Sequence, residues 1–280
     1  MTEGRVDGGR PKAVFYAALP LLIIAIVFSI AAYRRNFAWK DSLTLWSDAA
    51  AKSADKARPH YNYGNELALS GRLDEAFKED LRSLAIYPGQ PRVHANIGAI
   101  YQVWGYTDKA VEEYLTAISL KPNFAVAHNN LGYAYLTMGR EDEALAEFIL
   151  AVRYEPSHVK ARLNIGKVYA SRGNYEAAVI AYGGALKYAP GLAEAHLGIG
   201  AARLGQGNMA EAASEFAAAL RTRPDLAPAH AGLGAALERQ GRPEEAAGEY
   251  QAALRLDPVN EEAAAGLRRL YGGKGRGAKP

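Results

Sequence analysis

The sequence predicts an all-α protein, a solenoid of helix pairs preceded by one transmembrane helix. A 34-residue pattern occurs six times in succession over residues 57–260, without insertion or deletion. Each copy holds two stretches with apolar residues at helical spacing. An uncharged run, residues 13–33, lies before the repeats. Because repeats of this kind stack on one another, they predict an extended binding surface and leave little chain for a catalytic domain.

Residues 1–12 form a basic N-terminal tail, and residues 13–33 are predicted to cross a membrane. At about 1.5 Å rise per residue, the uncharged run spans roughly 30 Å, the thickness of a bilayer core. Lys12 and Arg34 end the run, and Tyr33 suits a membrane interface. A single-pass membrane protein is therefore expected, and the Ala-, Gly- and Arg-rich composition favours a bacterial inner membrane.

A cleaved secretory signal is the alternative interpretation, with Ser29-Ile30-Ala31 as its cleavage site. The apolar run is longer than the roughly 7–15 residues of a signal core, which favours the anchor. Basic residues do not decide the orientation, because three precede the run and three follow it. They are Arg5, Arg10, Lys12, Arg34, Arg35 and Lys40.

Charge and cysteine usage narrow the possible functions. The chain has a net charge of +3, but residues 57–271 carry 22 Lys and Arg against 25 Asp and Glu, so the basic excess lies in the flanks. This distribution argues against nucleic-acid binding. Cysteine is absent, which excludes disulfides, thiolate metal sites and a cysteine nucleophile.

Within each repeat, numbered 1–34 from its first residue, four positions never vary. In the third repeat they are Gly132 at position 8, Gly139 at 15, Ala144 at 20 and Pro156 at 32. Gly139 is the stop expected just past a helix end. Gly132 and Ala144 are expected to be small because one helix crosses closely over the other there. The repeats are 57–90, 91–124, 125–158, 159–192, 193–226 and 227–260.

An aromatic residue at position 24 and a small one at position 27 complete the pattern, which resembles the tetratricopeptide repeat (TPR). Position 24 holds Tyr or Phe in five repeats and Asp80 in the first. The resemblance implies antiparallel helix pairs stacked into a right-handed superhelix, whose first helices line the concave face.

Both ends of the array are expected to be capped. In the juxtamembrane segment 34–56, residues 41–52 place Trp46 one repeat length before the first position 24, and predict an N-terminal capping helix. Residues 261–271 predict a C-terminal capping helix with a polar outer face. Residues 272–280 are Gly-rich and basic, and predict a disordered tail.

The junction after the apolar run carries a second resemblance. Arg35-Asn36, Trp39, Leu45-Trp46 and the run 58–62 look like the stretch after the last membrane helix of multi-span glycosyltransferase-like proteins with TPR tails. In such proteins the repeats lie outside the cytoplasm. The chain departs from them by having one membrane segment and none of the catalytic loops. An extracytoplasmic repeat domain follows from this resemblance.

The Asn residues at position 6 of the first four repeats suggest a peptide-binding ladder. An Asn side chain offers a donor and an acceptor, and can therefore pair with a peptide backbone whatever its sequence. The pattern resembles the asparagine ladder in the repeats of nucleocytoplasmic O-linked N-acetylglucosamine transferases. Asn at this position is also common in TPRs of every function, which is the alternative interpretation. The ladder residues are Asn62, Asn96, Asn130 and Asn164.

The other residues predicted to face the groove are cations, amides and tyrosines, with no Asp or Glu at the inward positions of the first four repeats. This favours an acidic ligand. The candidate residues are Arg58, Tyr61, Asn65, Arg92, Asn129, Tyr133, Lys160 and Lys167. A clamp for chaperone C-termini is disfavoured, because Tyr61, Val126 and Asn130 fill its basic positions.

Histidine recurs at position 4, but successive repeats lie too far apart for these rings to share one metal ion. The rings are therefore expected to pack at the seam between helices. No catalytic, cofactor or metal motif is present in the sequence. The histidines are His60, His94, His128, His196 and His230, with Arg162 in the fourth repeat.

The predicted function is a membrane-anchored, non-enzymatic scaffold that binds an extended peptide or a partner protein, in envelope assembly or complex tethering. A non-catalytic arm associated with a membrane glycosyltransferase is the alternative.

Overall fold

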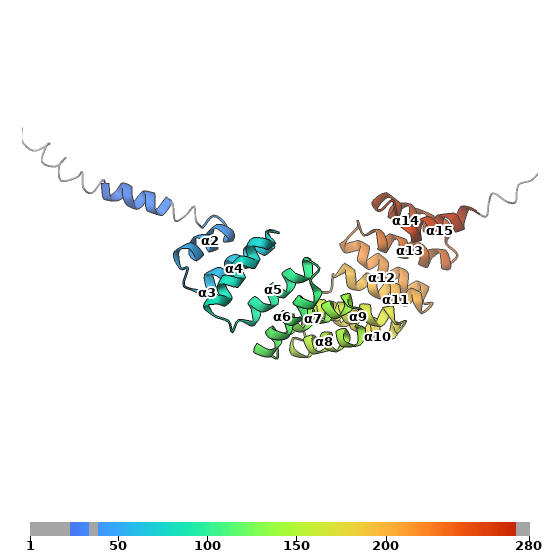
Figure 1. Cartoon of the computed structure of the whole chain (residues 1–280). Coiled ribbons are helices and arrows are strands. Elements are labelled where there is room, and N and C mark those ends of the chain that lie inside the picture. The colour runs from blue at the N-terminus through green and yellow to red at the C-terminus, as the bar shows by residue number, and fades with distance from the viewer. Residues whose placement is uncertain (1–22, 34–38, 273–280) are drawn as a thin grey trace, which may run out of the picture. The chain divides into compact units, whose positions relative to one another are not determined.

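The computed structural model describes residues 23–33 and 39–272. It divides into two compact units, one ending at Ile97 and the other beginning at Gly98. The described secondary structure is helical in both units (Figure 1).

The predicted membrane segment is described only in its second half. Residues 23–33 are helical and leave their apolar side chains exposed, with Phe28 69% and Val27 58% accessible. Among the described residues, none of the helices combines the length and the apolarity needed to cross a membrane. The predicted tail 1–12, residues 13–22 of the predicted span, residues 34–38 and the end of the C-terminal tail, 273–280, lie outside the described residues.

The first unit holds α2 (Ser42–Lys52), α3 (Ala57–Leu69), α4 (Leu73–Ile86) and the start of α5 (Pro91–Val103). Helix α2 lies within the predicted capping segment. Its N-cap is Asp41, whose carboxylate accepts a hydrogen bond from the Thr44 amide at 2.8 Å.

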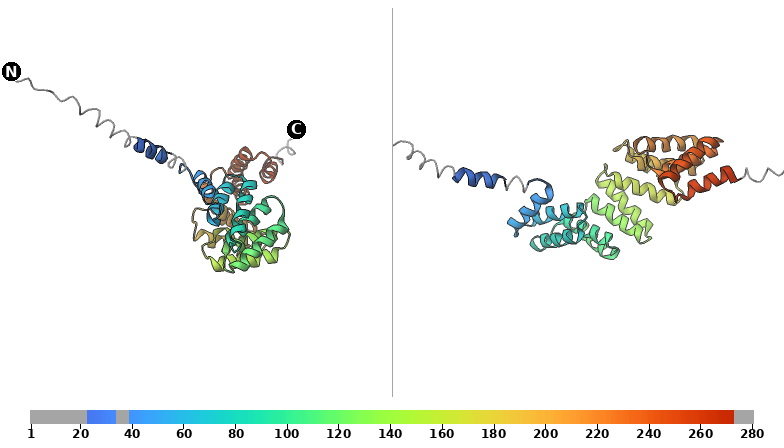
Figure 2. Two further views of the ribbon diagram at one scale, coloured as in Figure 1. Left: turned by 60° about the vertical axis from the view of Figure 1, so that its left-hand side comes forward. Right: turned by 90° about the horizontal axis from the view of Figure 1, so that it is seen from above.

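The second unit continues the same helix–turn–helix order to α15, which covers the segment predicted to cap the array (Figures 1 and 2). Each pair packs in the antiparallel manner that its short turn imposes. The helices are α6 (Thr107–Leu120), α7 (Ala125–Thr137), α8 (Glu141–Tyr154), α9 (Val159–Ser171), α10 (Tyr175–Leu186), α11 (Ala193–Gly205), α12 (Met209–Thr222), α13 (Ala227–Arg239), α14 (Pro243–Leu256) and α15 (Glu261–Gly272).

The glycine at position 15 ends every first helix, as the sequence predicts. Gly139 has φ +75°, a left-handed conformation that other residues adopt at a cost. The Gly139 amide donates to the Leu136 carbonyl at 3.0 Å, and the Arg140 amide donates to the Tyr135 carbonyl at 2.9 Å. This is a Schellman motif, which satisfies carbonyls at the helix end. The same left-handed glycine recurs at Gly71, Gly105, Gly173, Gly207 and Gly241.

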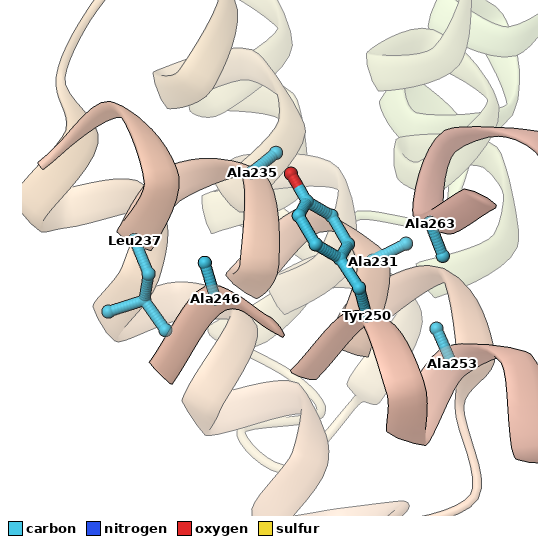
Figure 3. Close-up of a cluster of buried hydrophobic side chains, with 7 residues drawn as sticks. All are labelled: Ala231, Ala235, Leu237, Ala246, Tyr250, Ala253 and Ala263. Atoms are coloured by element: carbon cyan, nitrogen blue, oxygen red, sulfur yellow. The ribbon is translucent and has the colours of Figure 1, made fainter. Parts of the chain in front are cut away.

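The glycine at position 8 makes room for the aromatic ring at position 24. A Cβ on Gly132 would lie 2.8 Å from a ring carbon of Phe148 and 2.9 Å from the Ala144 carbonyl oxygen. Figure 3 shows the ring of the last repeat, Tyr250, among small side chains of α13, α14 and α15. The predicted close crossing of the two helices is therefore present, and the aromatic ring forms its core.

Asp80 replaces this aromatic ring in the first unit. Its side chain is 1% exposed, and Oδ1 has no hydrogen-bond partner among the described residues. Burial, followed by the charge of Glu79, raises the pKa of Asp80 to about 8. The first unit thus carries a buried carboxyl group where each other repeat has a ring.

Candidate peptide-binding site

Six of the predicted groove residues surround one pocket of about 310 Å³ in the second unit. Helix α7 contributes positions 5, 6 and 9, and helix α9 contributes positions 2, 5, 6 and 9. Residues at this spacing share one face of a helix, which is why the two helices present them together. The lining consists of Gln102, Asn129, Asn130, Tyr133, Lys160, Leu163, Asn164 and Lys167. We call it the amide pocket.

A chain of side-chain amides crosses the amide pocket. Asn164 Nδ2 donates to Asn129 Oδ1 at 3.1 Å, and Asn129 Nδ2 donates to Asn130 Oδ1 at 3.2 Å. Asn129 is only 7% exposed, whereas its two partners are half-buried. The bonds orient the amides, and each half-buried partner keeps hydrogen-bonding capacity beyond them.

Helix α5 contributes Gln102 to the lining of the amide pocket. Its Oε1 accepts a hydrogen bond from the hydroxyl of Tyr114 at 2.9 Å. Its Nε2 is buried and has no partner among the described residues. Burial of the Tyr114 hydroxyl raises the pKa of that group, so it stays protonated and remains a donor. Gln102, a lining residue of the pocket, thus keeps the N–H donors of its side chain unused.

Positive charge in the amide pocket comes from α9. Lys160 and Lys167 are exposed, and neither forms an ion pair with another described residue. No Asp or Glu stands among the described lining residues. The pocket is therefore electropositive and rich in hydrogen-bond donors.

The predicted residues of the first unit are not gathered in the same way. Asn96 Nδ2 donates to Asn65 Oδ1 at 2.5 Å, which brings positions 6 and 9 of successive repeats together. Tyr61 and Asn62 are half-buried, and Arg58 and Arg92 are exposed. None of these six lines the first unit's pocket of about 550 Å³, which contains His60, Glu79 and Arg82.

Position 6 changes from Asn to Gly in the fifth repeat for a steric reason. A Cβ on Gly198 would lie 2.6 Å from the Tyr182 ring, and one on Gly232 would lie 2.4 Å from the Phe216 ring. In this part of the second unit, position 6 packs against the aromatic ring of the preceding repeat. The amide residues end where this packing begins.

The histidines lie at the seam between helices, as predicted, and the structure adds their partners. His128 Nδ1 lies 2.6 Å from Glu147 Oε2, and Nε2 lies 2.9 Å from the Pro122 carbonyl oxygen. The Glu is always at position 23. The corresponding pairs are His60–Glu79, His196–Glu215 and His230–Glu249.

The fourth repeat replaces this pair with a different arrangement. Arg162 stands in the histidine position and donates to the Pro156 carbonyl through Nε at 3.0 Å and Nη2 at 2.9 Å. Position 23 is Ala181, and a Cβ on Gly184 would lie 2.7 Å from Arg162 Nη1. The guanidinium is larger than an imidazole ring, and the small residues Ala181 and Gly184 leave room for it.

Gln102 and Leu163 are pocket residues that the sequence reasoning missed. Gln102 stands at position 12, which helical spacing places on the inward face of the first helix, and position 12 is polar in only two repeats, as Gln102 and Glu238. A polar residue at a position that is otherwise apolar is a signal in the sequence that points to Gln102. Leu163 carries no such signal, because Leu is also common in helix cores.

Comparisons with known proteins identify the class of this chain as an α-helical repeat protein. Family models described as TPR repeat and tetratricopeptide repeat match residues 105–139 and, in overlapping windows, 129–193, 163–227 and 197–261. Together these matches span residues 105–261, more than half of the 280 residues, and the chain belongs to the TPR family. Repeats of this family are generally non-catalytic scaffolds.

Three solved structures illustrate the shared fold. The APC/C hetero-tetramer Cut9–Hcn1 matches with a TM-score of 0.71 and 17% identity, over 82% of this chain and 46% of that chain. This chain thus spans less than half the length of that one.

YrrB, a TPR protein with an unusual peptide-binding site, matches with a TM-score of 0.57 and 20% identity, over 68% and 97% of the two chains. PilW, a widely conserved type IV pilus biogenesis factor, matches with a TM-score of 0.67 and 21% identity, over 75% and 98%. At such identities the likeness shows the fold alone. No curated protein matches the sequence.

Proposed function

We propose that this protein is a scaffold whose second unit binds an extended segment of a partner protein in the amide pocket. The observation that supports this function most directly is the hydrogen-bonded run Asn164–Asn129–Asn130 at the pocket's surface. Every residue of an extended segment except proline offers one backbone N–H and one C=O. Oriented amides can pair with both groups, so they hold a segment without requiring one sequence. The peptide-binding site named for YrrB agrees with this function.

The proposal includes a membrane anchor formed by residues 13–33, with the repeats outside the cytoplasm of a bacterial cell in envelope assembly or complex tethering. The uncharged run and the exposed aliphatic residues of 23–33 support the anchor. The resemblance of the junction after the run to glycosyltransferase-like proteins with TPR tails, whose repeats lie outside the cytoplasm, supports the compartment. Since the chain has no cysteine, a Gly277→Cys variant in intact cells tests it. Labelling by a membrane-impermeant maleimide before lysis is expected, and labelling only after lysis contradicts the orientation.

The binding function is tested by co-purification from native membranes after mild crosslinking. The variant Asn129→Ala/Asn130→Ala/Asn164→Ala is expected to lose the crosslinked partner, while Asn123→Ala, in the exposed α6–α7 turn, is expected to keep it. Circular dichroism melting of both variants separates lost binding from lost folding. Retention of the partner by the folded triple variant overturns the amide pocket as the binding site.

A further inference from the structure

The last repeat contains an arrangement similar to that of Tyr114 and Gln102, with a further side chain added to it. The hydroxyl of Tyr250 donates to Glu238 Oε2 at 2.6 Å, in the way that Tyr114 donates to Gln102. Glu238 and Gln102 occupy the same position of their repeats, four repeat lengths apart. The two sites therefore share one geometry up to this point.

The two sites differ in whether a further side chain forms hydrogen bonds with the residue at position 12. Arg269 of α15 reaches Glu238 with two hydrogen bonds, Nε to Oε1 at 3.0 Å and Nη2 to Oε2 at 2.7 Å. The residue four repeat lengths before Arg269 is Tyr133, which is 53% exposed and lines the amide pocket. No described side chain takes the place of Arg269 beside Gln102, and Gln102 Nε2 is left without a partner.

A buried donor without an acceptor costs free energy, and bound ligand is one way in which such a group is satisfied. The acceptor must be an oxygen that reaches the pocket between Gln102 and the two lysines of α9. Lys160 and Lys167 favour an oxygen that carries negative charge. A carboxylate meets both conditions, because it accepts hydrogen bonds and carries the complementary charge.

We infer that the amide pocket takes a carboxylate of the bound segment, with Gln102 Nε2 as its hydrogen-bond donor and Lys160 and Lys167 as its charge partners. This inference rests on the proposed peptide-binding function and adds the chemistry of the segment. The carboxylate is either an Asp or Glu side chain or the C-terminus of the partner. Both sources present the same two oxygens to Gln102.

The chain itself supplies the test variant. Gln102→Glu/Tyr133→Arg rebuilds the Glu238–Arg269–Tyr250 arrangement beside Tyr114 and leaves the net charge unchanged. It removes the free donor, and it is expected to fold because the last repeat already packs in this way. Asn123→Ala serves as the matched surface control.

The probes are two phage libraries of random dodecapeptides, one with both peptide ends blocked by fusion and one with a free C-terminus. Selection on the wild-type protein is expected to enrich Asp or Glu at one position in the first library if the source is a side chain. If the source is a terminus, binders are expected from the second library alone. Anisotropy with a selected peptide is then expected to show about tenfold or more weaker binding to the double variant, and unchanged binding to Asn123→Ala.

The outcomes separate the two proposals. Absence of binders from both libraries overturns the peptide-binding function itself. Binders that show neither an acidic preference nor a need for a free C-terminus leave peptide binding standing and overturn the carboxylate. Carboxylate-dependent binders that bind the folded double variant equally well overturn the assignment to Gln102.

Discussion

His128 and Glu147 stand nineteen residues apart in the sequence and join the two helices of the third repeat through a contact of 2.6 Å between Nδ1 and Oε2. The other ring nitrogen faces the Pro122 carbonyl at 2.9 Å. Both partners accept hydrogen bonds, whereas a neutral imidazole donates from one nitrogen only. The doubly protonated ring is therefore the form that satisfies both contacts.

This geometry predicts a pH-dependent contribution to stability. Burial of the ring opposes its charged form, but the hydrogen bonds to Glu147 and Pro122, with the charge of Glu147, together raise the pKa of His128. The folded pKa is above the unfolded value of about 6.5, so the stabilisation is fully present below that pH and is lost as the pH rises through the folded pKa.

We expect Glu147→Gln to lower the pKa of His128, measured by NMR titration of its ring protons. The variant is also expected to lose more thermal stability at pH 6 than at pH 8.5. Glu112→Gln, on the exposed face of α6, is the control and is expected to change neither. An unaltered titration of His128 in the Glu147 variant contradicts the prediction.

Adding one methyl group at Gly132 is expected to destabilise the third repeat by about 1–3 kcal/mol, because the new Cβ would overlap Phe148 and the backbone of Ala144. Gly248→Ala is the matched control. Gly248 is exposed on α14 with nothing within 4 Å of the added Cβ, so a gain of about 0.5–1 kcal/mol is expected. Urea unfolding followed by circular dichroism measures both. Equal effects of the two substitutions contradict the steric role of Gly132.

Much of the fold could be predicted because each invariant position has one local physical reason. Gly139 is invariant for its positive φ and Gly132 for its contact with Phe148. The face that carries Asn130 and Asn164 also followed from helical spacing. The contact between Asn164 and Asn129 did not, because it depends on how far one repeat is displaced from the next.

The unpartnered donor of Gln102 lay beyond sequence reasoning for a similar reason. It depends on Tyr114 of the same repeat and on Tyr133, where the arrangement in the last repeat has Arg269. Three helices must be placed before that combination can be seen. The exchange of His and Glu for Arg162 and Ala181 becomes meaningful only once positions 4 and 23 are known to touch.

Asp80 predicts a second pH effect, in the first unit. Burial, with the charge of Glu79, raises the pKa of Asp80 to about 8, above the unfolded value of about 3.9. Burying the protonated carboxyl group costs less free energy than burying the charged one. The stability of the folded state is therefore highest below the unfolded pKa and falls as the pH rises through about 8. Asp80→Phe restores the ring of the other repeats and removes the unpartnered oxygen. A gain of about 1–3 kcal/mol is expected.

The advantage of Asp80→Phe is expected to grow between pH 5 and pH 8.5, as measured by thermal melting. Asp74→Asn, on the exposed start of α4, is the control and should not change with pH in this way. A variant less stable than the wild type at both pH values would show that the first unit has no room for the ring.

The fourth repeat predicts an energetic coupling between Arg162 and Gly184. The guanidinium carbon of Arg162 lies 5.4 Å from the centroid of the Tyr188 ring, over the space that a side chain at Gly184 would enter. Gly184→Leu is therefore expected to displace Arg162 and to destabilise the repeat. In the background Arg162→His/Ala181→Glu, which rebuilds the pair of the third repeat, the same substitution should be tolerated. The third repeat combines that pair with Leu150 at the position of Gly184. A double-mutant cycle on urea unfolding should give a coupling of about 0.5–3 kcal/mol.

Gly183→Leu, at an exposed position with nothing within 4 Å, should have the same effect in both backgrounds. An equal loss from Gly184→Leu in the two backgrounds would mean that the small residue at 184 does not serve Arg162.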